Sequence, residues 1–212
     1  MESRRSIDEL INEGYQVHIG DYINKGVEIF KQNIGGFIGF ILLVFLINLV
    51  LGFIPIIGGL ASIAISGPLG VGIFIVSAKI MKEEPYEFGD FFKGFNFFLP
   101  LLLASLVVGI LVVLGMILLI IPGIYLAIAY TFTNMLIVER RMEFWEAMET
   151  SRKIVTKSWF PIFGLILLLG LLNLLGMIAL CIGILVTAPI TSCAMAAAYD
   201  DIIGIESTDF EG

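Results

Sequence analysis

The stretch from Gly94 to Val138, GFNFFLPLLLASLVVGILVVLGMILLIIPGIYLAIAYTFTNMLIV, contains no Asp, Glu, Lys, Arg or His and decides the fold class. One helix needs roughly 20 predominantly apolar residues to cross the hydrocarbon core of a bilayer, so this stretch has the length for two crossings. Two other uncharged stretches, Gln32 to Ala78 and Ser158 to Tyr199, are of similar length. We therefore predict an all-α integral membrane bundle of six transmembrane helices, arranged as three helical hairpins.

The composition agrees with this prediction. Of the 212 residues 58% are hydrophobic and only 15% are charged, and the mean hydropathy is +1.01. Soluble chains carry roughly 25% charged residues. The first apolar stretch follows a long polar segment and no small-residue cleavage site comes after a short apolar core, so we expect no secretory signal.

Helix-breaking residues mark the predicted turns within the hairpins, because proline lacks a backbone donor and glycine raises the entropic cost of a helix. These residues are Pro55, Gly58 and Gly59, then Pro122 and Gly123, then Gly183. The predicted spans are 34–54, 58–80, 97–121, 123–138, 161–179 and 183–199. The predicted organisation is a polar cytoplasmic segment (1–20), a membrane domain (21–201, with hairpins at about 34–80, 97–138 and 161–199) and an acidic cytoplasmic tail (202–212).

Charge placement predicts the orientation. All twelve Lys and Arg residues lie in the N-terminal segment or in the connections between the second and third and between the fourth and fifth spans. With six spans these segments share one side, which the positive-inside rule makes the cytoplasm. We expect a multi-pass protein of the cell (inner) membrane with both termini cytoplasmic. The net charge of −7 argues against a nucleic-acid partner.

The three hairpins look like parallel repeats when Gly58, Gly123 and Gly183 are superposed. Each hairpin follows a segment with apolar residues at helical spacing, around 22–30, 88–95 and 144–159. We interpret these segments as amphipathic interfacial helices that lie on the membrane, with a partner-docking surface as the alternative.

The sequence offers no catalytic, cofactor-binding or metal-binding motif. The only histidine, His18, lies in the polar N-terminal segment, and the pairs Glu83/Glu84 and Asp200/Asp201 are interpreted as solvated faces. We expect no cofactor and no enzymatic activity.

The predicted spans contain neutral polar residues and prolines but no ionisable side chain in their cores. The candidate positions are Asn48, Pro68, Asn134, Asn173 and Pro189. Asn most often hydrogen-bonds between membrane helices, which favours a packing role. The alternative is a neutral-lined pathway in which the two prolines free backbone carbonyls.

Several motifs carry a family resemblance. They are GMILLIIPGIYLAIAY (115–130), LIVE (136–139), EAMETSR (146–152), ILVTAPI (184–190) and YDD (199–201). In these positions the chain resembles a group of prokaryotic polytopic membrane proteins of unknown function, among them the membrane domain attached to some glycerophosphodiester phosphodiesterases. The resemblance covers about half of the chain and implies a membrane domain. It transfers no phosphodiesterase activity, because the acidic and histidine cluster of such a hydrolase is missing.

Three functional hypotheses follow. The first is a non-enzymatic membrane protein that binds lipid or a protein partner at its cytoplasmic face, with a role in assembly or membrane homeostasis. The second is a permease or channel for a neutral or lipid-like small solute. The third is an intramembrane enzyme, which would need titratable groups such as Glu139 or Asp200 to meet Arg152. The sequence leaves oligomerisation open.

Overall fold

The computed structural model describes residues 7–178 and 183–211, and within these ranges the regular structure is helical, with no β-strand. In chain order the elements are α1 (Ile7–Glu13), α2 (Ile19–Gln32), α3 (Ile34–Gly52), α4 (Ile57–Gly70), α5 (Gly72–Met81), the 3-10 helix η1 (Phe88–Phe97), α6 (Phe98–Leu118), α7 (Ile120–Ala129), α8 (Thr133–Arg140), α9 (Phe144–Lys157), α10 (Trp159–Ile178) and α11 (Ile184–Ile202).

Five helical segments of the described residues are long and apolar enough to cross a membrane, by length and composition alone. They are Ile34–Gly52, Ile57–Met81, Phe88–Leu118, Ile120–Arg140 and Trp159–Ile178. They coincide with the first five predicted spans, although residue 179, the end of the fifth, lies outside the described residues. The sixth predicted span corresponds to α11, which is not among the five. This helix contains five Ala and two Thr residues, and Asp200 and Asp201 lie in its last turn.

The chain reverses direction close to the predicted turns, but in the first two hairpins not at the glycines that marked them; Gly183 directly precedes α11. The first reversal lies between α3 and α4 and includes Pro55, whereas Gly58 is already in α4. The second lies at Leu119, whose backbone is extended, while Gly123 is within α7. A Cβ atom on Gly58 would meet the carbonyl oxygen of Leu51, and one on Gly123 would meet Met116. These glycines therefore permit close helix contact rather than the turn itself.

Two of the predicted spans are broken helices. A break at Val71 separates α4 from α5, and a turn at 130–132 separates α7 from α8. A Cβ atom on Gly72, just after the first break, would meet the carbonyl oxygen of Phe91 in η1. The glycine thus allows η1 to pack directly on the broken helix.

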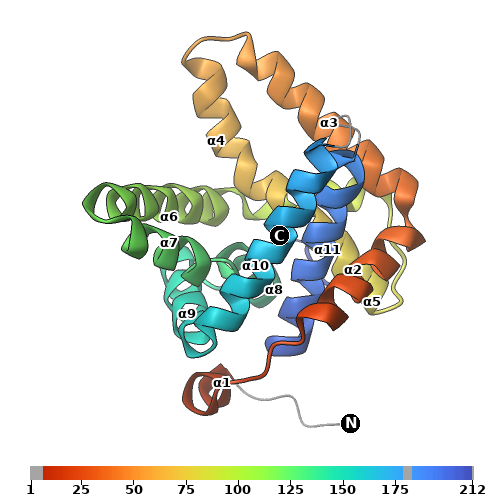
Figure 1. Cartoon of the computed structure of the whole chain (residues 1–212). Coiled ribbons are helices and arrows are strands. Elements are labelled where there is room, and N and C mark those ends of the chain that lie inside the picture. Colours follow the sequence, from red (N-terminus) through yellow and green to blue (C-terminus); the bar gives the residue numbers. More distant parts are fainter. Residues whose placement is uncertain (1–6, 179–182, 212) are drawn as a thin grey trace.

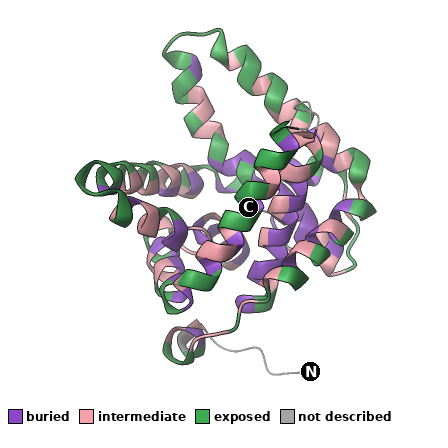
Figure 2. Ribbon diagram, in the orientation of Figure 1, coloured by how far each residue is buried: buried purple, intermediate pink, exposed green. Residues whose placement is uncertain are grey.

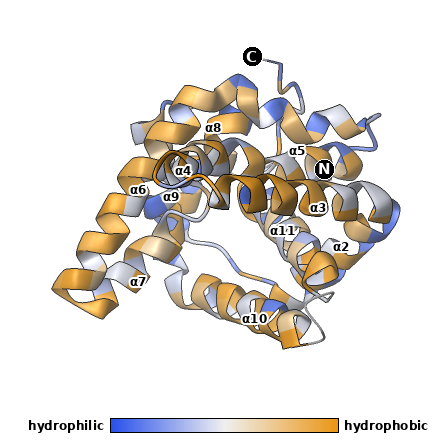
Figure 3. Ribbon diagram, turned by 90° about the horizontal axis from the view of Figure 1, so that it is seen from above, coloured by the Kyte–Doolittle hydropathy of each residue, from blue (hydrophilic) through white to orange (hydrophobic). Residues whose placement is uncertain are grey.

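Burial divides the molecule into exposed hairpins and a packed body. The body comprises α2, α5, α8, α9, α11 and residues 203–211, and most of its inward side chains are inaccessible to solvent. Helix α11 is its central element and packs against α2, α10, α5 and α3. The first helices of the hairpins, α3, α6 and α10, show apolar side chains to the exterior along most of their length (Figures 2 and 3).

The hairpins leave the body in different directions. In Figure 1 the α3 and α4 pair rises from the body, while α6 and α7 extend to the left. The two pairs meet near their bases, where a Cβ atom on Gly67 would lie 3.0 Å from the hydroxyl of Ser105 and 3.2 Å from Leu101. The predicted parallel alignment of these hairpins is therefore not seen in this arrangement.

The three predicted amphipathic segments are helical, as α2, η1 and α9. The apolar faces of α2 and α9 point inward, whereas Phe88 and Phe95 of η1 are 47% and 39% exposed. Tyr22 and Phe30 of α2 are 2% and 5% exposed, and Phe91 of η1 is fully buried. Met148 and Val155 of α9 are likewise buried. For α2 and α9 the prediction that the apolar stripe lies on the membrane is corrected, because these stripes face the protein core. For η1 it stays a prediction.

Candidate functional site

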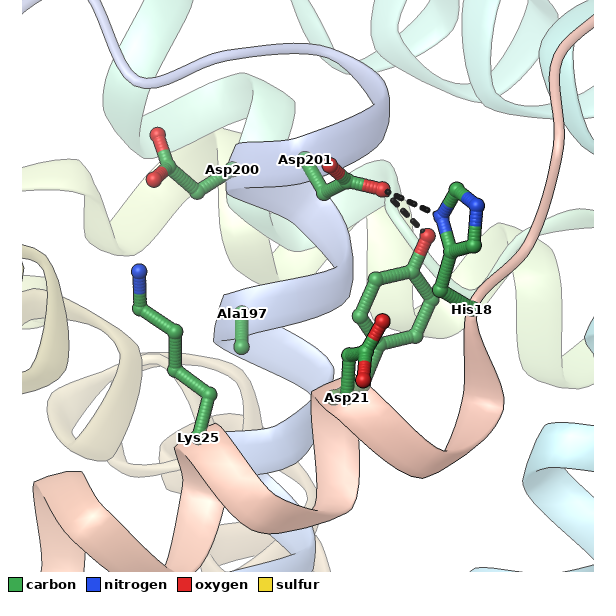
Figure 4. A pocket seen from close by; sticks show the side chains of 7 residues that line it. His18, Asp21, Lys25, Ala197, Asp200 and Asp201 are labelled. Carbon is green, nitrogen blue, oxygen red and sulfur yellow. Dashed lines mark hydrogen bonds and ion pairs between the residues drawn. The ribbon is translucent and has the colours of Figure 1, made fainter.

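A polar cavity of about 280 Å³ lies where the start of α2 meets the end of α11 (Figure 4). Its lining residues are His18, Asp21, Tyr22, Lys25, Ala197, Asp200 and Asp201. The close packing of these two helices positions the cavity, because a Cβ atom on Gly26 would lie only 2.7 Å from the backbone nitrogen of Ala194. Glycine at this position brings the two backbones together, and the larger polar side chains surround the opening beside it.

Tyr22 and Asp201 form the shortest hydrogen bond of the cavity. The hydroxyl of Tyr22 donates a 2.6 Å hydrogen bond to Oδ2 of Asp201, and Nδ1 of His18 lies 3.5 Å from the same oxygen. Burial, together with the hydrogen bond to the Asp201 carboxylate, raises the pKa of Tyr22 above its ordinary value. Tyr22 therefore remains a proton donor to Asp201 at neutral pH.

The second carboxylate of the pair, Asp200, has different partners. Its Oδ1 atom lies 3.6 Å from Nζ of Lys82 and accepts a 3.1 Å hydrogen bond from the backbone nitrogen of Ile205. Figure 4 shows Asp200 and Asp201 pointing in different directions from α11. The cavity contains more carboxylates than ammonium groups and would favour a cationic group over an anionic one. Among the described residues no group of three or more His, Cys, Asp or Glu side chains is placed to hold a metal ion.

The titratable groups named for an enzyme are engaged elsewhere. Arg152 donates to both oxygens of Glu149, at 3.2 and 2.7 Å. The side chain of Glu139, which is fully buried, instead accepts hydrogen bonds from Nε of Arg140 at 2.8 Å and from the hydroxyl of Tyr199 at 2.7 Å. Arg152 is thus paired with Glu149 rather than with either of the carboxylates expected as its partners.

Two of the predicted polar positions, Asn48 and Asn173, lie in different surroundings. Asn48 is exposed on α3, and its side-chain amide donates a 2.9 Å hydrogen bond to the carbonyl oxygen of Val44 in the same helix. Asn173 lies on α10, and its Oδ1 atom is shielded from solvent without a hydrogen-bond partner in the described part of the chain. No hydrogen bond between described residues joins the two asparagines.

The other candidate positions are dispersed over three helices. Pro68 is buried in α4, where the backbone of Gly94 in η1 packs against its carbonyl oxygen. Pro189 is buried in α11, and Asn134 is half-buried in α8. The structure therefore does not bring the five candidates together in one site.

A row of buried polar atoms lies between α10 and α11. The hydroxyls of Thr187 and Thr191, one helical turn apart on α11, are shielded and without partners among the described residues, as is Oδ1 of Asn173. A Cβ atom on Gly176 would meet the Thr187 hydroxyl. Because the helices are antiparallel, helical spacing places Asn173, nearly one turn before Gly176, opposite Thr191.

Sequence reasoning missed the polar cavity. It placed His18 in the polar N-terminal segment and interpreted the pair Asp200/Asp201 as a solvated face, although Tyr22 and Asp201 are hydrogen-bonded across 179 positions of the chain. The available signal was the apolar stripe of α2, which requires a covering helix but does not identify it. Comparison of the chain with protein-family models, with curated proteins and with solved structures finds no match.

Proposed function

We propose that this chain is an integral membrane protein whose three hairpins, α11 included, lie in the bilayer and whose charged segments, α1, α2, η1, α9 and residues 200–211, lie on the cytoplasmic side of the cell (inner) membrane. The exposed apolar surface of the first helices carries this proposal. Leu46 on α3, Ile110 on α6 and Leu175 on α10 are 53%, 58% and 64% exposed. Removing such a side chain from water is worth about 1.5–3 kcal/mol, so lipid is the favourable surrounding for these faces.

The distribution of charge supports the proposed topology. No charged residue lies in 32–78, 94–138 or 158–199, so the charges of the described residues lie in α1, α2, η1, α9, the ends of α5, α8 and α11, and the connecting segments. Leu10 of α1 is 2% exposed against the body, and residues 203–211 pack on the body as well. An even number of crossings, with α11 as the sixth and least lipid-exposed span, places both described ends on this one side.

Breaks in two helices would let the hairpins align across a membrane. Val71, between α4 and α5, has Gly70 and Gly72 as neighbours, and residues 130–132 interrupt the α7 and α8 pair. Both breaks lie at the bases of their hairpins, next to the body. Val71 and Phe132 are buried at these points, so a change in hairpin direction there would require the core around them to repack.

Within the membrane, the proposed role is non-enzymatic binding of lipid or of a protein partner, in assembly or membrane homeostasis. The carboxylates that an enzyme would need are used in structural pairs, as at Glu139. We also propose that residues 115–201 are similar to the membrane domain of glycerophosphodiester phosphodiesterases. Native mass spectrometry after mild detergent release should show a retained phospholipid or protein. A chain released repeatedly without either would contradict the binding role.

Lysine substitution tests the membrane assignment. Leu46→Lys and Ile110→Lys should reduce the amount of protein that resists alkaline carbonate extraction, because lysine at the centre of a membrane helix costs about 2.5–3.5 kcal/mol. Trp145→Lys is the matched control, since Trp145 is 57% exposed but lies on α9 of the body. If the hairpin variants were as well integrated as the control, the proposal would fail.

A second candidate function is a permease or channel for a neutral or lipid-like solute. The unpaired oxygens of Asn173, Thr187 and Thr191 between α10 and α11 favour it, because buried polar atoms without partners among the described residues can hydrogen-bond a passing solute. Solute flux into liposomes that Thr187→Val abolishes would support this candidate. Flux unchanged by the substitution would remove the observation that favours it.

A further inference from the structure

Residues 203–211, here called the strap, leave the end of α11 and run across the body. Gly204 follows the helix with a φ of +84°, a left-handed conformation that suits glycine and turns the chain away from the helix axis. From there the strap contacts residues of η1, α8 and α11, which belong to segments far apart in the sequence. The surface that the strap contacts, here called the groove, is therefore formed by several other elements.

Both N–H groups and carbonyl groups of the strap main chain are hydrogen-bonded to other elements. Glu139 accepts hydrogen bonds from the backbone nitrogens of Glu206, at 2.7 Å, and Ser207, at 3.3 Å. Arg140 donates to the carbonyl oxygen of Gly204 at 3.0 Å, and Asn96 donates to that of Phe210 at 3.0 Å. Main-chain contacts of this kind hold a bound segment whatever its side chains are.

Acidic side chains of the strap each meet a cation of the groove. Glu206 lies 2.6 Å from Arg140, Asp209 lies 3.5 Å from Arg141, and Glu211 lies 2.7 Å from Lys93. These pairs would select acidic residues at three positions of a bound segment. They lie at the rim, where exposed ion pairs contribute specificity more than affinity.

Phe210 supplies the apolar anchor. It is 1% exposed, and its ring lies edge-on to that of Phe74 on α5, with centroids 6.4 Å apart. Phe74 in turn contacts Tyr199 edge-on at 5.2 Å. The anchor thus packs on aromatic rings of the body, which is the kind of central contact that dominates peptide binding.

The polar groups of the groove are held in place by contacts that do not involve the strap. Asp90 lies 3.1 Å from Nζ of Lys93 and 2.9 Å from Nζ of Lys79. The hydroxyl of Tyr199 and Nε of Arg140 likewise fix the carboxylate of Glu139. Supports that do not involve the strap would pre-organise the groove, and pre-organisation of this kind lowers the cost of binding.

We propose that this groove is a peptide-binding site for an extended acidic segment with an aromatic anchor, and that the strap is its resident, detachable occupant. This inference rests on the proposed binding role. It specifies the partner as a protein that presents an acidic segment with an aromatic residue. Because the strap is part of the same chain, its effective concentration at the groove is on the order of millimolar. It therefore excludes segments of other proteins that bind the groove more weakly. Release of the strap opens the site to a partner segment of the same character.

The test uses the full chain in mild detergent and a fluorescent peptide, IGIESTDFE, which copies residues 203–211. A strap variant with Phe210→Ala, Glu206→Gln and Glu211→Gln should bind this peptide at least about tenfold more tightly than the parent protein, measured by fluorescence anisotropy. A milder variant, Glu206→Gln with Glu211→Gln, retains the anchor and should show a smaller gain. It keeps the test decisive if the triple variant does not fold.

Two controls locate the binding. Adding Asn96→Ala and Arg141→Ala to the strap variant should abolish the gain, because these exposed side chains contact the strap main chain without supporting the core. A peptide with alanine in place of the phenylalanine should not bind. The proposal would be overturned if the parent and both strap variants bound the peptide equally. It would also be overturned if neither strap variant bound the peptide, or if the groove substitutions left binding unchanged. Carbonate extraction of the same variants reports separately on the membrane assignment.

Discussion

Tyr199 on α11 donates a 2.7 Å hydrogen bond to Oε2 of Glu139 on α8, and neither side chain is accessible to solvent. The contact joins two segments separated by 60 positions within the packed body. Arg140 neutralises the same carboxylate oxygen, at 2.8 Å. A buried carboxylate is tolerated when its charge is paired and its oxygens accept hydrogen bonds, so Glu139 depends on each of these donors.

Tyr199→Phe should therefore lower the stability of the protein by about 1–3 kcal/mol, because one oxygen of Glu139 loses a buried donor. Tyr86→Phe is the matched control, since its hydroxyl makes only a 3.4 Å contact, to the carbonyl oxygen of Gln32. Thermal unfolding in detergent measures both. Equal melting temperatures for the two variants would mean that the Tyr199 hydrogen bond carries no net stabilisation.

Gly26→Ala should destabilise the contact between α2 and α11. The new methyl group would lie 2.7 Å from the backbone nitrogen and 2.9 Å from the Cα atom of Ala194, so the helices must separate. Gly20→Ala in the same helix is the control, because no atom of the described residues lies within 4 Å of its Cβ position. That change should be neutral or stabilising by about 0.5–1 kcal/mol through helix propensity. Chemical unfolding should show a loss of stability for Gly26→Ala alone, and the reverse order would contradict the packing.

Tyr22 should make the stability of the protein fall at high pH. Burial and the Asp201 hydrogen bond raise the pKa of Tyr22 in the folded chain. The folded state therefore retains a proton that the unfolded state releases above the ordinary tyrosine pKa of about 10. This contribution is present in full below pH 10 or so and is lost as the pH rises toward the raised folded pKa.

In Tyr22→Phe the decline of stability above about pH 10 should consequently be shallower than in the parent protein, although the variant is less stable at neutral pH. Unfolding free energies at several pH values between roughly 8 and 11 give the comparison. Parallel curves for the two proteins would show that Tyr22 does not couple folding to proton release.

Thr187→Val separates packing from a solute pathway at the α10 and α11 interface. The Thr187 hydroxyl has no partner among the described residues, so its replacement by a methyl group should leave stability unchanged or raise it, by up to about 1–3 kcal/mol. Thr156→Val is the control, because the Thr156 hydroxyl donates a 2.6 Å hydrogen bond to the carbonyl oxygen of Arg152, which valine cannot make. A loss of stability at Thr187 would indicate a bound hydrogen-bonding group and favour the permease.

The positions of the helices could be predicted from the sequence because charge and hydropathy report on them directly. Helices α3, α6 and α10 begin and end within a few residues of their predicted bounds. The surroundings of each helix could not be predicted in the same way. Helix α11 is apolar enough to suggest lipid contact, yet its alanines at 194 and 196–198 are buried against other helices. Hydropathy alone does not distinguish lipid from a protein core.

The sites were less predictable than the helices because they depend on long-range contacts. The residues of the cavity come from both ends of the chain, and each alone resembles an ordinary surface residue. The strap appeared in the sequence as an acidic tail, and its buried Phe210 gave no signal of a groove. Asn48 was chosen for its polarity in an apolar helix, but its side-chain amide hydrogen-bonds to a backbone carbonyl of the same helix, α3. Polarity within a span marks a candidate but does not say what it faces.

Accessibility of two engineered cysteines would test the membrane topology most directly. In a background with Cys181→Ala and Cys193→Ala, Ile56→Cys probes the turn between α3 and α4, and Trp145→Cys probes α9 of the body; both positions are exposed, at 82% and 57%. A membrane-impermeant maleimide added to intact cells should label Ile56→Cys at once and Trp145→Cys only after the membrane is permeabilised. Labelling of both cysteines from the same side of the membrane would contradict an apolar hairpin that crosses the bilayer and a body that remains in the cytoplasm.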